Sequence, residues 1–394
     1  MNALQDVLEN AVAAGHAPGF AAAAITPSGK RVFAAAGVRT AAGAVAMTTD
    51  TVFWIASCTK AITTVAALQL VERGLIDLDE PLGPRLPALA SPSVLTGFDA
   101  AGEPITRPAR EAITLRRLLT HTSGFAYDFY CADLTRYLAA TGQTLSPAQT
   151  PDIPLMFEPG AAWQYGIGVD WAGRVIEAVS GQPLADYFDA HILTPLGMSD
   201  TTFFPREDQT ERRAGVHQPV PGGGFAAIPF GMPPTPHFMM GGGGLYSTVS
   251  DYLTFLSAIL GGGQAPGGAR ILKSATVAMM RANQIGNLTV GALTSAQPSV
   301  AYTCEFMPGV TKRWGLGFLI NETPGPAGRS AGSLAWAGLA NCYYWADPAT
   351  GVAGVLFSQL FPFADPKVLA TFDAVERAVY GGVAESDRKR TLSV

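Results

Sequence analysis

Charged residues are scarce in this sequence: Asp, Glu, Lys and Arg make up 14% of its 394 residues, against roughly 25% in typical globular chains. The net charge is −5, with 26 basic and 31 acidic residues, and no run of Lys or Arg occurs before the last few residues. The chain therefore lacks the basic surface with which proteins bind nucleic acids or anionic membranes. Because 48% of the residues are hydrophobic, intrinsic disorder is excluded too. We expect a globular protein with no nucleic-acid or membrane partner.

Cysteine is also rare, and the four cysteines (Cys58, Cys131, Cys304 and Cys342) stand alone, without a C-x-x-C pair. This spacing excludes a disulfide framework and is typical of buried thiols in a reducing compartment. The five histidines show no H-E-x-x-H motif and no close pairing, so no metal site is predicted. The glycines at 241–244 belong to no phosphate-binding motif and indicate a flexible loop. The sequence thus predicts no metal and no cofactor.

Long hydrophobic runs are absent as well. No stretch of about 20 residues avoids glycine, proline and charge well enough to span a bilayer. The first fifteen residues contain Asp6 and Glu9 and lack a basic segment followed by an unbroken apolar one, so they do not form a secretory signal. We therefore expect a cytoplasmic protein.

The apolar periodicities predict an α+β fold whose sheet is built from both ends of the chain. Helices are expected from the start of the chain to Gly15, at 59–73, and at 366–381, with a frayed charged tail at 385–394. Strands are expected at 19–26, 31–36, 314–320, 333–339, 342–346 and 352–358. Since strands occur on both sides of the middle region, neither half of the chain could fold without the other.

The middle of the chain has a different pattern. Short helices, predicted at 115–120, 169–179 and 251–260, alternate with loops rich in proline and glycine. We expect a discontinuous sheet domain at 1–74 and 266–394, a mostly helical inserted domain at 75–265, and an active site between them.

One short motif carries the chemistry. In Ser57-Cys58-Thr59-Lys60, a serine stands where an apolar strand-like run meets a long helix, and the lysine lies one helical turn later on the same face. A serine hydroxyl becomes nucleophilic only when a base takes its proton, and a lysine can do so only if it is desolvated. The alternative is that Ser57 merely caps the helix and Lys60 is solvated.

Two other serines and one tyrosine also stand in patterns that can carry chemistry. Ser386 is also followed by a lysine, Lys389, but lies in the charged tail. Ser330 fits a G-x-S-x-G pattern, yet no strand leads into it and no histidine follows it. Tyr165 follows a Pro-Gly turn and precedes a helix, which places its phenol at a loop apex where it could share the role of base. The alternative is a buried structural aromatic.

Together, several segments resemble the serine β-lactamase and penicillin-binding-protein superfamily, in its class C-like branch. They are the S-x-x-K motif with its helix, the segment 74–82, Leu118-Leu119-Thr120-His121-Thr122-Ser123-Gly124, Phe157-Glu158-Pro159-Gly160 leading into Tyr165, and Trp314-Gly315-Leu316-Gly317-Phe318. The greatest similarity is to the family VIII carboxylesterases. The resemblance implies a β-lactamase/transpeptidase-like fold, in which an antiparallel sheet is flanked by helices and accompanied by a helical domain.

The resemblance also implies roles for individual residues. Ser57 would be the nucleophile, Lys60 the activating amine and Tyr165 the phenolate partner, all acting without a metal. The backbone N–H groups of Ser57 and Leu339 would form the oxyanion hole. The sequence Trp336-Ala337-Gly338 stands where β-lactamases have K-T-G, so this strand would line the substrate site.

Two departures from β-lactamases define the expected substrate. Ile167 replaces an Asn and Trp336 replaces a Lys, so the groups that hold a β-lactam amide and carboxylate are missing. We expect a serine carboxylesterase that acts through an acyl-enzyme on small uncharged esters. The alternatives are an acyltransferase of the same superfamily, a weak β-lactamase or peptidase, and a binding module that has kept the fold. The natural ester and the oligomeric state are not encoded in these motifs.

Overall fold

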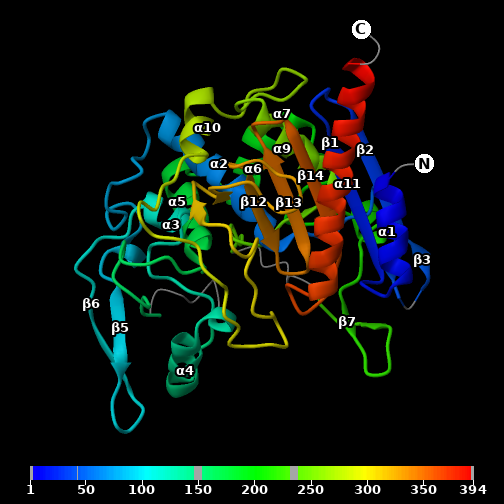
Figure 1. Cartoon of the computed structure of the whole chain (residues 1–394). Coiled ribbons are helices and arrows are strands. Elements are labelled where there is room, and N and C mark those ends of the chain that lie inside the picture. Colours follow the sequence, from blue (N-terminus) through cyan, green and yellow to red (C-terminus); the bar gives the residue numbers. More distant parts are fainter. Residues whose placement is uncertain (1–2, 42, 146–152, 231–237, 392–394) are drawn as a thin grey trace.

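An eight-stranded antiparallel sheet forms the centre of the computed structural model, which describes residues 3–41, 43–145, 153–230 and 238–391 (Figure 1). Strands from the two chain ends meet inside this sheet, where β1 pairs with β14. The spatial order is β10 (Lys312–Trp314), β11 (Leu319–Asn321), β12 (Leu334–Gly338), β13 (Cys342–Asp347), β14 (Val352–Phe357), β1 (Gly19–Ile25), β2 (Arg31–Thr40) and β3 (Val45–Ala46). The expected α+β, β-lactamase/transpeptidase-like fold is confirmed.

Helices cover both faces of the sheet. On one face α1 (Ala3–Ala13) packs on β2 and beside α11 (Pro366–Thr391), which crosses β14 in Figure 1. On the other face α9 (Val249–Leu260) packs on β1, β13 and β14. Every residue of β1, β12, β13 and β14 is buried. This explains why these strands are continuous apolar runs instead of alternating patterns.

The middle of the chain contains the expected helices but also hairpins. Its helices are α3 (Leu115–Leu119), α4 (Ala132–Thr141), α5 (Gly168–Ser180), α6 (Leu184–Phe188), α7 (Thr194–Leu196) and α8 (Glu207–Glu211), with α10 (Ser274–Met280) after α9. Short 3₁₀ turns, η2 (Pro87–Leu89) and η3 (Asp128–Tyr130), and a π turn, η5 (Asp189–Leu193), lie among them. The hairpins are β5 (Ser93–Phe98) with β6 (Pro104–Pro108), and β7 (His217–Pro219) with β8 (Phe225–Ala227).

Two predicted elements differ from the structure. The expected strand at 314–320 is a pair of strands, β10 and β11, because Gly317 adopts a left-handed φ of +81° and the chain reverses there. The last helix continues through Gly381 and Gly382 to Thr391 instead of ending near Gly381. The residues after these glycines are mostly good helix formers, so the helix tolerates two weak positions. The proposed domain boundaries remain predictions, and α9, from the expected insert, packs on the sheet.

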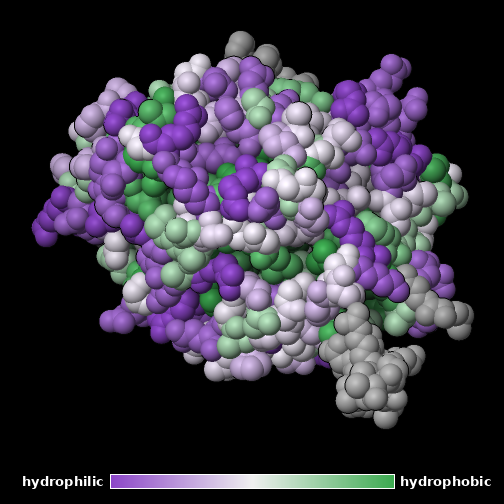
Figure 2. All heavy atoms as spheres, turned by 90° about the horizontal axis from the view of Figure 1, so that it is seen from above, coloured by the Kyte–Doolittle hydropathy of each residue, from purple (hydrophilic) through white to green (hydrophobic). Residues whose placement is uncertain are grey.

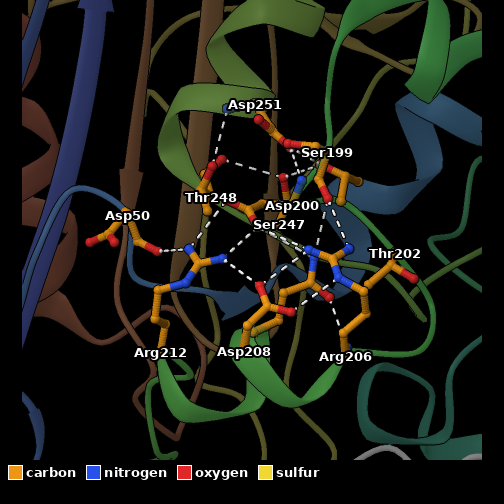
Figure 3. A network of polar contacts seen from close by, with 12 residues as sticks. Asp50, Ser199, Asp200, Thr202, Arg206, Asp208, Arg212, Ser247, Thr248 and Asp251 are labelled. Carbon is orange, nitrogen blue, oxygen red and sulfur yellow. Dashed lines mark hydrogen bonds and ion pairs between the residues drawn. The ribbon is translucent and has the colours of Figure 1, made fainter.

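A polar network ties the segment 199–212 to the start of α9 (Figure 3). The Asp251 carboxylate accepts hydrogen bonds from the backbone N–H of Asp200 (2.8 Å) and from the Thr201 hydroxyl (3.0 Å). Asp200 also pairs with Arg212 at 2.6 Å, and Arg212 donates to the Asp50 carbonyl at 2.6 Å. Asp50 precedes β4 (Phe53–Trp54), which pairs with β9 (Tyr246–Ser247). The network therefore ties the segment 199–212 to α9 and to the chain before β4.

The surface seen in Figure 2 is largely hydrophilic or neutral, and hydrophobic residues show mainly in a narrow hollow across this face. Within the described residues, no helix is both long and apolar enough to cross a membrane. All four cysteines are free thiols; three are buried, and Cys131 is half-buried. The described part of the chain also holds no group of three potential metal ligands.

The buried Asp251 predicts a pH-dependent stability. Burial raises the pKa of its carboxyl to about 6, above the unfolded value of about 3.9. The stability that this group contributes is therefore complete below pH 4 and is lost as the pH rises through 6. Asp251→Asn keeps an oxygen for the hydrogen bonds but does not titrate. Its stability relative to wild type should rise by on the order of 2 kcal/mol between pH 4 and pH 8.

Urea unfolding at several pH values measures this difference in unfolding free energy. A difference that stays constant from pH 4 to pH 8 would contradict the assignment.

Candidate active site

A short strained turn presents Ser57. The chain leaves β4 at Ile55, passes through Ala56 at an unusual φ of +44°, and enters a 3₁₀ turn, η1 (Ala56–Cys58), before α2 (Thr59–Glu72) begins. The Ile55 N–H donates to the Leu245 carbonyl (3.0 Å), and the Trp54 indole donates to the Gly243 carbonyl (2.7 Å). These bonds hold the turn against the glycine segment 241–244, so the strain at Ala56 is compensated by its surroundings.

Lys60 lies directly beneath Ser57 and is fully buried. Its Nζ donates to three oxygens: Ser57 Oγ at 3.1 Å, the Tyr127 hydroxyl at 3.0 Å and the Gly242 carbonyl at 2.7 Å. These three oxygens match the three N–H donors of an ammonium group. In the neutral amine, which has two N–H donors and a lone pair, the Ser57 hydroxyl can instead donate to the lone pair. The alternative of a solvated lysine beside a helix-capping serine is therefore excluded, and no side-chain cap is present at the start of α2.

Two phenols flank the Lys60 amine. Tyr127 hydrogen-bonds to it directly, whereas Tyr165 presents the face of its ring, with Nζ 4.9 Å from the ring centroid. The Tyr165 hydroxyl accepts a hydrogen bond from the Trp336 indole at 3.1 Å. Burial raises the pKa of Tyr127 well above its usual range, so this phenol is neutral near pH 7 and can both accept and donate. Sequence reasoning found Tyr165 but missed Tyr127.

His121 lies behind Tyr165, with ring centroids 4.8 Å from Tyr165 and 4.9 Å from Trp314. Its two ring nitrogens have no hydrogen-bond partner among the described residues. Burial lowers the pKa of His121 well below its usual range, and the Lys60 charge adds to this effect. The imidazole is therefore neutral and supports the Tyr165 ring by packing.

A cavity of about 230 Å³ opens above Ser57. Aromatic and aliphatic side chains dominate its wall, and no Lys or Arg is part of that wall within the described residues. The side chains that line it include Trp54, Tyr127, Phe129, Tyr130, Leu145, Tyr165, Ile167, Met240, Trp336, Leu339 and Phe363. Such a wall favours an uncharged apolar ligand.

The structure brings most of the predicted residues to this cavity. Its wall includes Ser57, Tyr165, Ile167, Trp336, Ala337 and Leu339. Gly338 does not line the cavity. It instead lies against the backbone just before the nucleophile, where a Cβ would stand 2.2 Å from the Ile55 carbonyl oxygen. Ser330 lies in the turn before β12, where its N–H donates to Asp347 at 2.9 Å, and it does not line the cavity.

Sequence reasoning missed three groups of this site: Tyr127, Asp170 and the carbonyl of Gly242. Tyr127 stands three residues after the segment that ends at Gly124, so its nearness to a recognised motif was the available signal. The glycines at 241–244 are not a loosely packed loop as expected. The Gly241 and Gly242 carbonyls accept hydrogen bonds from Thr63 (2.5 Å) and Lys60 (2.7 Å).

The family comparison agrees with this geometry. The model of the family described as Beta-lactamase matches residues 4–378. The chain belongs to the beta-lactamase family. This membership covers the sheet, the inserted region and every residue of the site described above. The fold and the resemblance to the serine β-lactamase and penicillin-binding-protein superfamily are confirmed, whereas the greater similarity to family VIII carboxylesterases stays a prediction.

Relatives within the beta-lactamase family include transferases and an esterase. The chain is 35% identical to monacolin J acid methylbutanoyltransferase of Aspergillus terreus over 84% of this chain and 82% of that protein. It is 34% identical to lovastatin esterase of Penicillium rubens, over 78% and 79%. Unliganded simvastatin synthase from Aspergillus terreus superposes with a TM-score of 0.82 at 31% identity, covering 96% of this chain and 97% of that one.

The contact of Gly338 with Ile55 generates a prediction. Gly338→Ala should destabilise the protein by about 1 to 3 kcal/mol, because the new methyl group meets rigid backbone that cannot move aside. Gly291→Ala is the matched control, since a Cβ there meets nothing within 4 Å, and its effect should stay within about 0.5 kcal/mol. Chemical denaturation measures both. Equal stability of the two variants would show that β12 can shift away from the nucleophile turn.

Proposed function

We propose that this protein is a serine acyl-transferring enzyme, which moves a small acyl group through an acyl-Ser57 intermediate to the hydroxyl of an apolar acceptor. One observation carries the proposal: Ser57 Oγ lies 3.1 Å from the buried Lys60 amine at the base of an apolar cavity. A serine is activated by a base within hydrogen-bond reach, and the cavity supplies the place where the acyl group and acceptor would meet.

The proposed first step is attack of Ser57 Oγ on the carbonyl carbon of an ester or thioester donor. The Ser57 proton passes to the unprotonated Lys60 amine and then, through a tyrosine hydroxyl, to the departing oxygen or sulfur. In the second step the acceptor hydroxyl attacks the acyl-Ser57 carbonyl, its proton follows the same route in reverse, and Ser57 is released. The backbone N–H groups of Ser57 and Leu339, both at the cavity wall, are proposed to stabilise the oxyanion.

Acyl transfer is favoured over hydrolysis by two considerations. Relatives that match more than four-fifths of this chain bear transferase names, including monacolin J acid methylbutanoyltransferase. The apolar cavity wall also suits an apolar acceptor. Hydrolysis, the activity expected from the sequence, is the second candidate, and the 34% identity to a lovastatin esterase supports it.

The composition of the cavity wall also favours uncharged substrates. Ile167 and Trp336 both line it, and its described lining contains Asp128 and Asp170 but no cation. A β-lactam carboxylate would lose water there without gaining a partner, which costs about 1 to 3 kcal/mol or more for a charged group. Efficient β-lactam hydrolysis is therefore not part of the proposal.

An acyl-partition experiment tests the function. With p-nitrophenyl butyrate as donor and increasing concentrations of an apolar secondary alcohol, we expect butyrate ester to replace free butyrate as the main product, measured by mass spectrometry. Ser57→Ala should abolish both products, whereas Ser330→Ala should leave them largely unchanged. If free butyrate is the only product at every alcohol concentration, the enzyme is a hydrolase instead. Donor turnover that persists in Ser57→Ala would contradict the proposal.

The two phenols generate a separate prediction about proton transfer. Tyr127→Phe removes the hydroxyl that contacts Lys60, so we expect kcat to fall by about 10² to 10⁴-fold with a smaller change in KM. Tyr165→Phe tests the role implied by the resemblance and should also lower kcat. Tyr130→Phe is the matched control, because this cavity tyrosine has a buried hydroxyl without a hydrogen-bond partner in the described structure. Near-full activity of Tyr127→Phe would leave Tyr165 as the proton carrier.

A further inference from the structure

A buried aspartate lies next to the reacting groups. Asp170 stands in the first turn of α5 and is only 3% exposed. Its Oδ1 accepts a hydrogen bond from the backbone N–H of Gly242 at 2.9 Å. The carbonyl of the same residue accepts from Lys60 Nζ at 2.7 Å. One glycine therefore joins the carboxylate to the amine, with one hydrogen bond on each side.

Asp170 can lie this close to Gly242 because glycine has no side chain. A Cβ on Gly242 would stand 2.4 Å from Asp170 Oδ2 and 2.9 Å from Oδ1, a separation that no side chain tolerates. The carboxylate thus fills the space that any other residue at 242 would occupy. This close contact fixes the direction of the Gly242 carbonyl and hence the position of the Lys60 amine.

Tyr127, the other partner of the amine, also lies close to the Asp170 carboxylate. Asp170 Oδ2 has no hydrogen-bond partner within normal distance among the described residues, yet the Tyr127 hydroxyl is close enough to lower the pKa of this carboxyl. Burial has the larger effect and raises the pKa, while the Lys60 charge and the Gly242 N–H oppose it. The Lys60 charge therefore favours the ionised form of Asp170 against the effect of burial.

Several other titratable groups surround Lys60. Burial raises the pKa of Cys58 and of Tyr127 and lowers that of His121, so these three are neutral near pH 7. Tyr165 presents its ring face to the amine. The charge of Asp128 adds to the rise in the pKa of Tyr127, and its carboxylate accepts a hydrogen bond from Gln297 at 2.9 Å. Asp170 is thus the carboxylate linked to Lys60 through a single residue.

We propose that Asp170 is a positioning residue for the acyl-transfer reaction: it holds Lys60 under Ser57 through Gly242 and balances the ammonium charge that forms when Lys60 takes the serine proton. This inference rests on the proposed function. In the resting enzyme Asp170 fixes the geometry through a hydrogen bond. During the attack its negative charge favours the protonated amine, since both groups are buried. The sequence alone gave no reason to select this residue.

Labelling of Ser57 by a fluorophosphonate tests the inference, because it reports nucleophile activation without needing the natural substrate. Asp170→Asn keeps an acceptor for the Gly242 N–H but removes the charge, and Asp170→Ala removes both. We expect Asp170→Ala to slow labelling about a hundredfold, the loss that follows from a misplaced reacting group, and Asp170→Asn to slow it less. With p-nitrophenyl butyrate, kcat should fall while KM changes little.

The pH dependence of the Ser57 labelling rate distinguishes the proposed role of Asp170 from a purely structural one. If the Asp170 charge favours the protonated form of the general base, removing this charge should move the acidic limb of the labelling rate to lower pH in both variants. Asp251→Asn is the matched control: Asp251 is also a buried aspartate that accepts a backbone N–H bond in the first turn of a helix. It should leave the labelling rate and the acidic limb unchanged.

The outcomes are distinguishable. If wild-type Ser57 is not labelled, the proposed function fails. If wild type is labelled and the Asp170 variants are labelled at the same rate with an unmoved acidic limb, the inference is wrong. It is also wrong if the variants lose labelling rate only in proportion to their unfolded fraction. Should neither variant fold, Asp170→Glu keeps the charge but displaces it by one methylene. Slowed labelling of its folded form would support the inference, and an unchanged rate would overturn it.

Discussion

The complete burial of the Lys60 amine is the constraint on which this site depends. An ammonium group without water needs an acceptor for each N–H, and here the acceptors come from three separate parts of the chain: Ser57, Tyr127 and Gly242. Losing any one of them would leave a buried charge partly unsatisfied, which costs more than an ordinary hydrogen bond contributes. The same contacts that make burial tolerable also place the amine against the serine, so the stability and the chemistry of this site share one set of bonds.

The sheet supplies the rigidity that such an arrangement requires. Strand β12 lies directly against the backbone before Ser57 because Gly338 has no side chain, and α9 fixes the same region from the other side, where the Tyr252 hydroxyl donates to the Cys58 carbonyl at 2.8 Å. Segments that lie more than 180 residues apart therefore meet at the nucleophile. This explains why the strained φ of Ala56 is maintained.

Under the proposed function, the cavity adapts a beta-lactamase-family scaffold to an uncharged substrate. The proposed reacting groups, Ser57, Lys60 and the tyrosines, lie at its base, whereas Ile167 and Trp336 present apolar surface in its wall. The Trp336 indole also donates to the Tyr165 hydroxyl. Trp336, which stands where β-lactamases have a Lys, therefore affects both the polarity of the cavity wall and the hydrogen bonding of the Tyr165 hydroxyl. The wall and the proposed reacting groups are thus not fully independent.

The sequence by itself determined the elements whose signal is local. The apolar runs at 19–26 and 352–358 predicted strands, which the structure shows as β1 and β14. The periodicity after Thr59 predicted α2, and the spacing of Ser57 and Lys60 placed both on one helical face. Family motifs added Tyr165 and Trp336. Glycines were not predicted correctly, because a glycine alone does not fix the backbone conformation. Gly317 adopts a left-handed φ and reverses the chain between β10 and β11, whereas Gly381 stays helical within α11.

Only the tertiary structure decided which groups contact the Lys60 amine. Asp170 lies in the helix predicted at 169–179 and Tyr127 follows a family motif, but neither signal points to Lys60. The glycines at 241–244 had the pattern of a loose loop. Their roles come from distances between parts of the chain that are remote in sequence, such as the 2.9 Å bond from Gly242 to Asp170. A local pattern can show that a lysine lies near a serine. Whether that lysine is buried, and what holds it there, depends on how the whole chain packs around it.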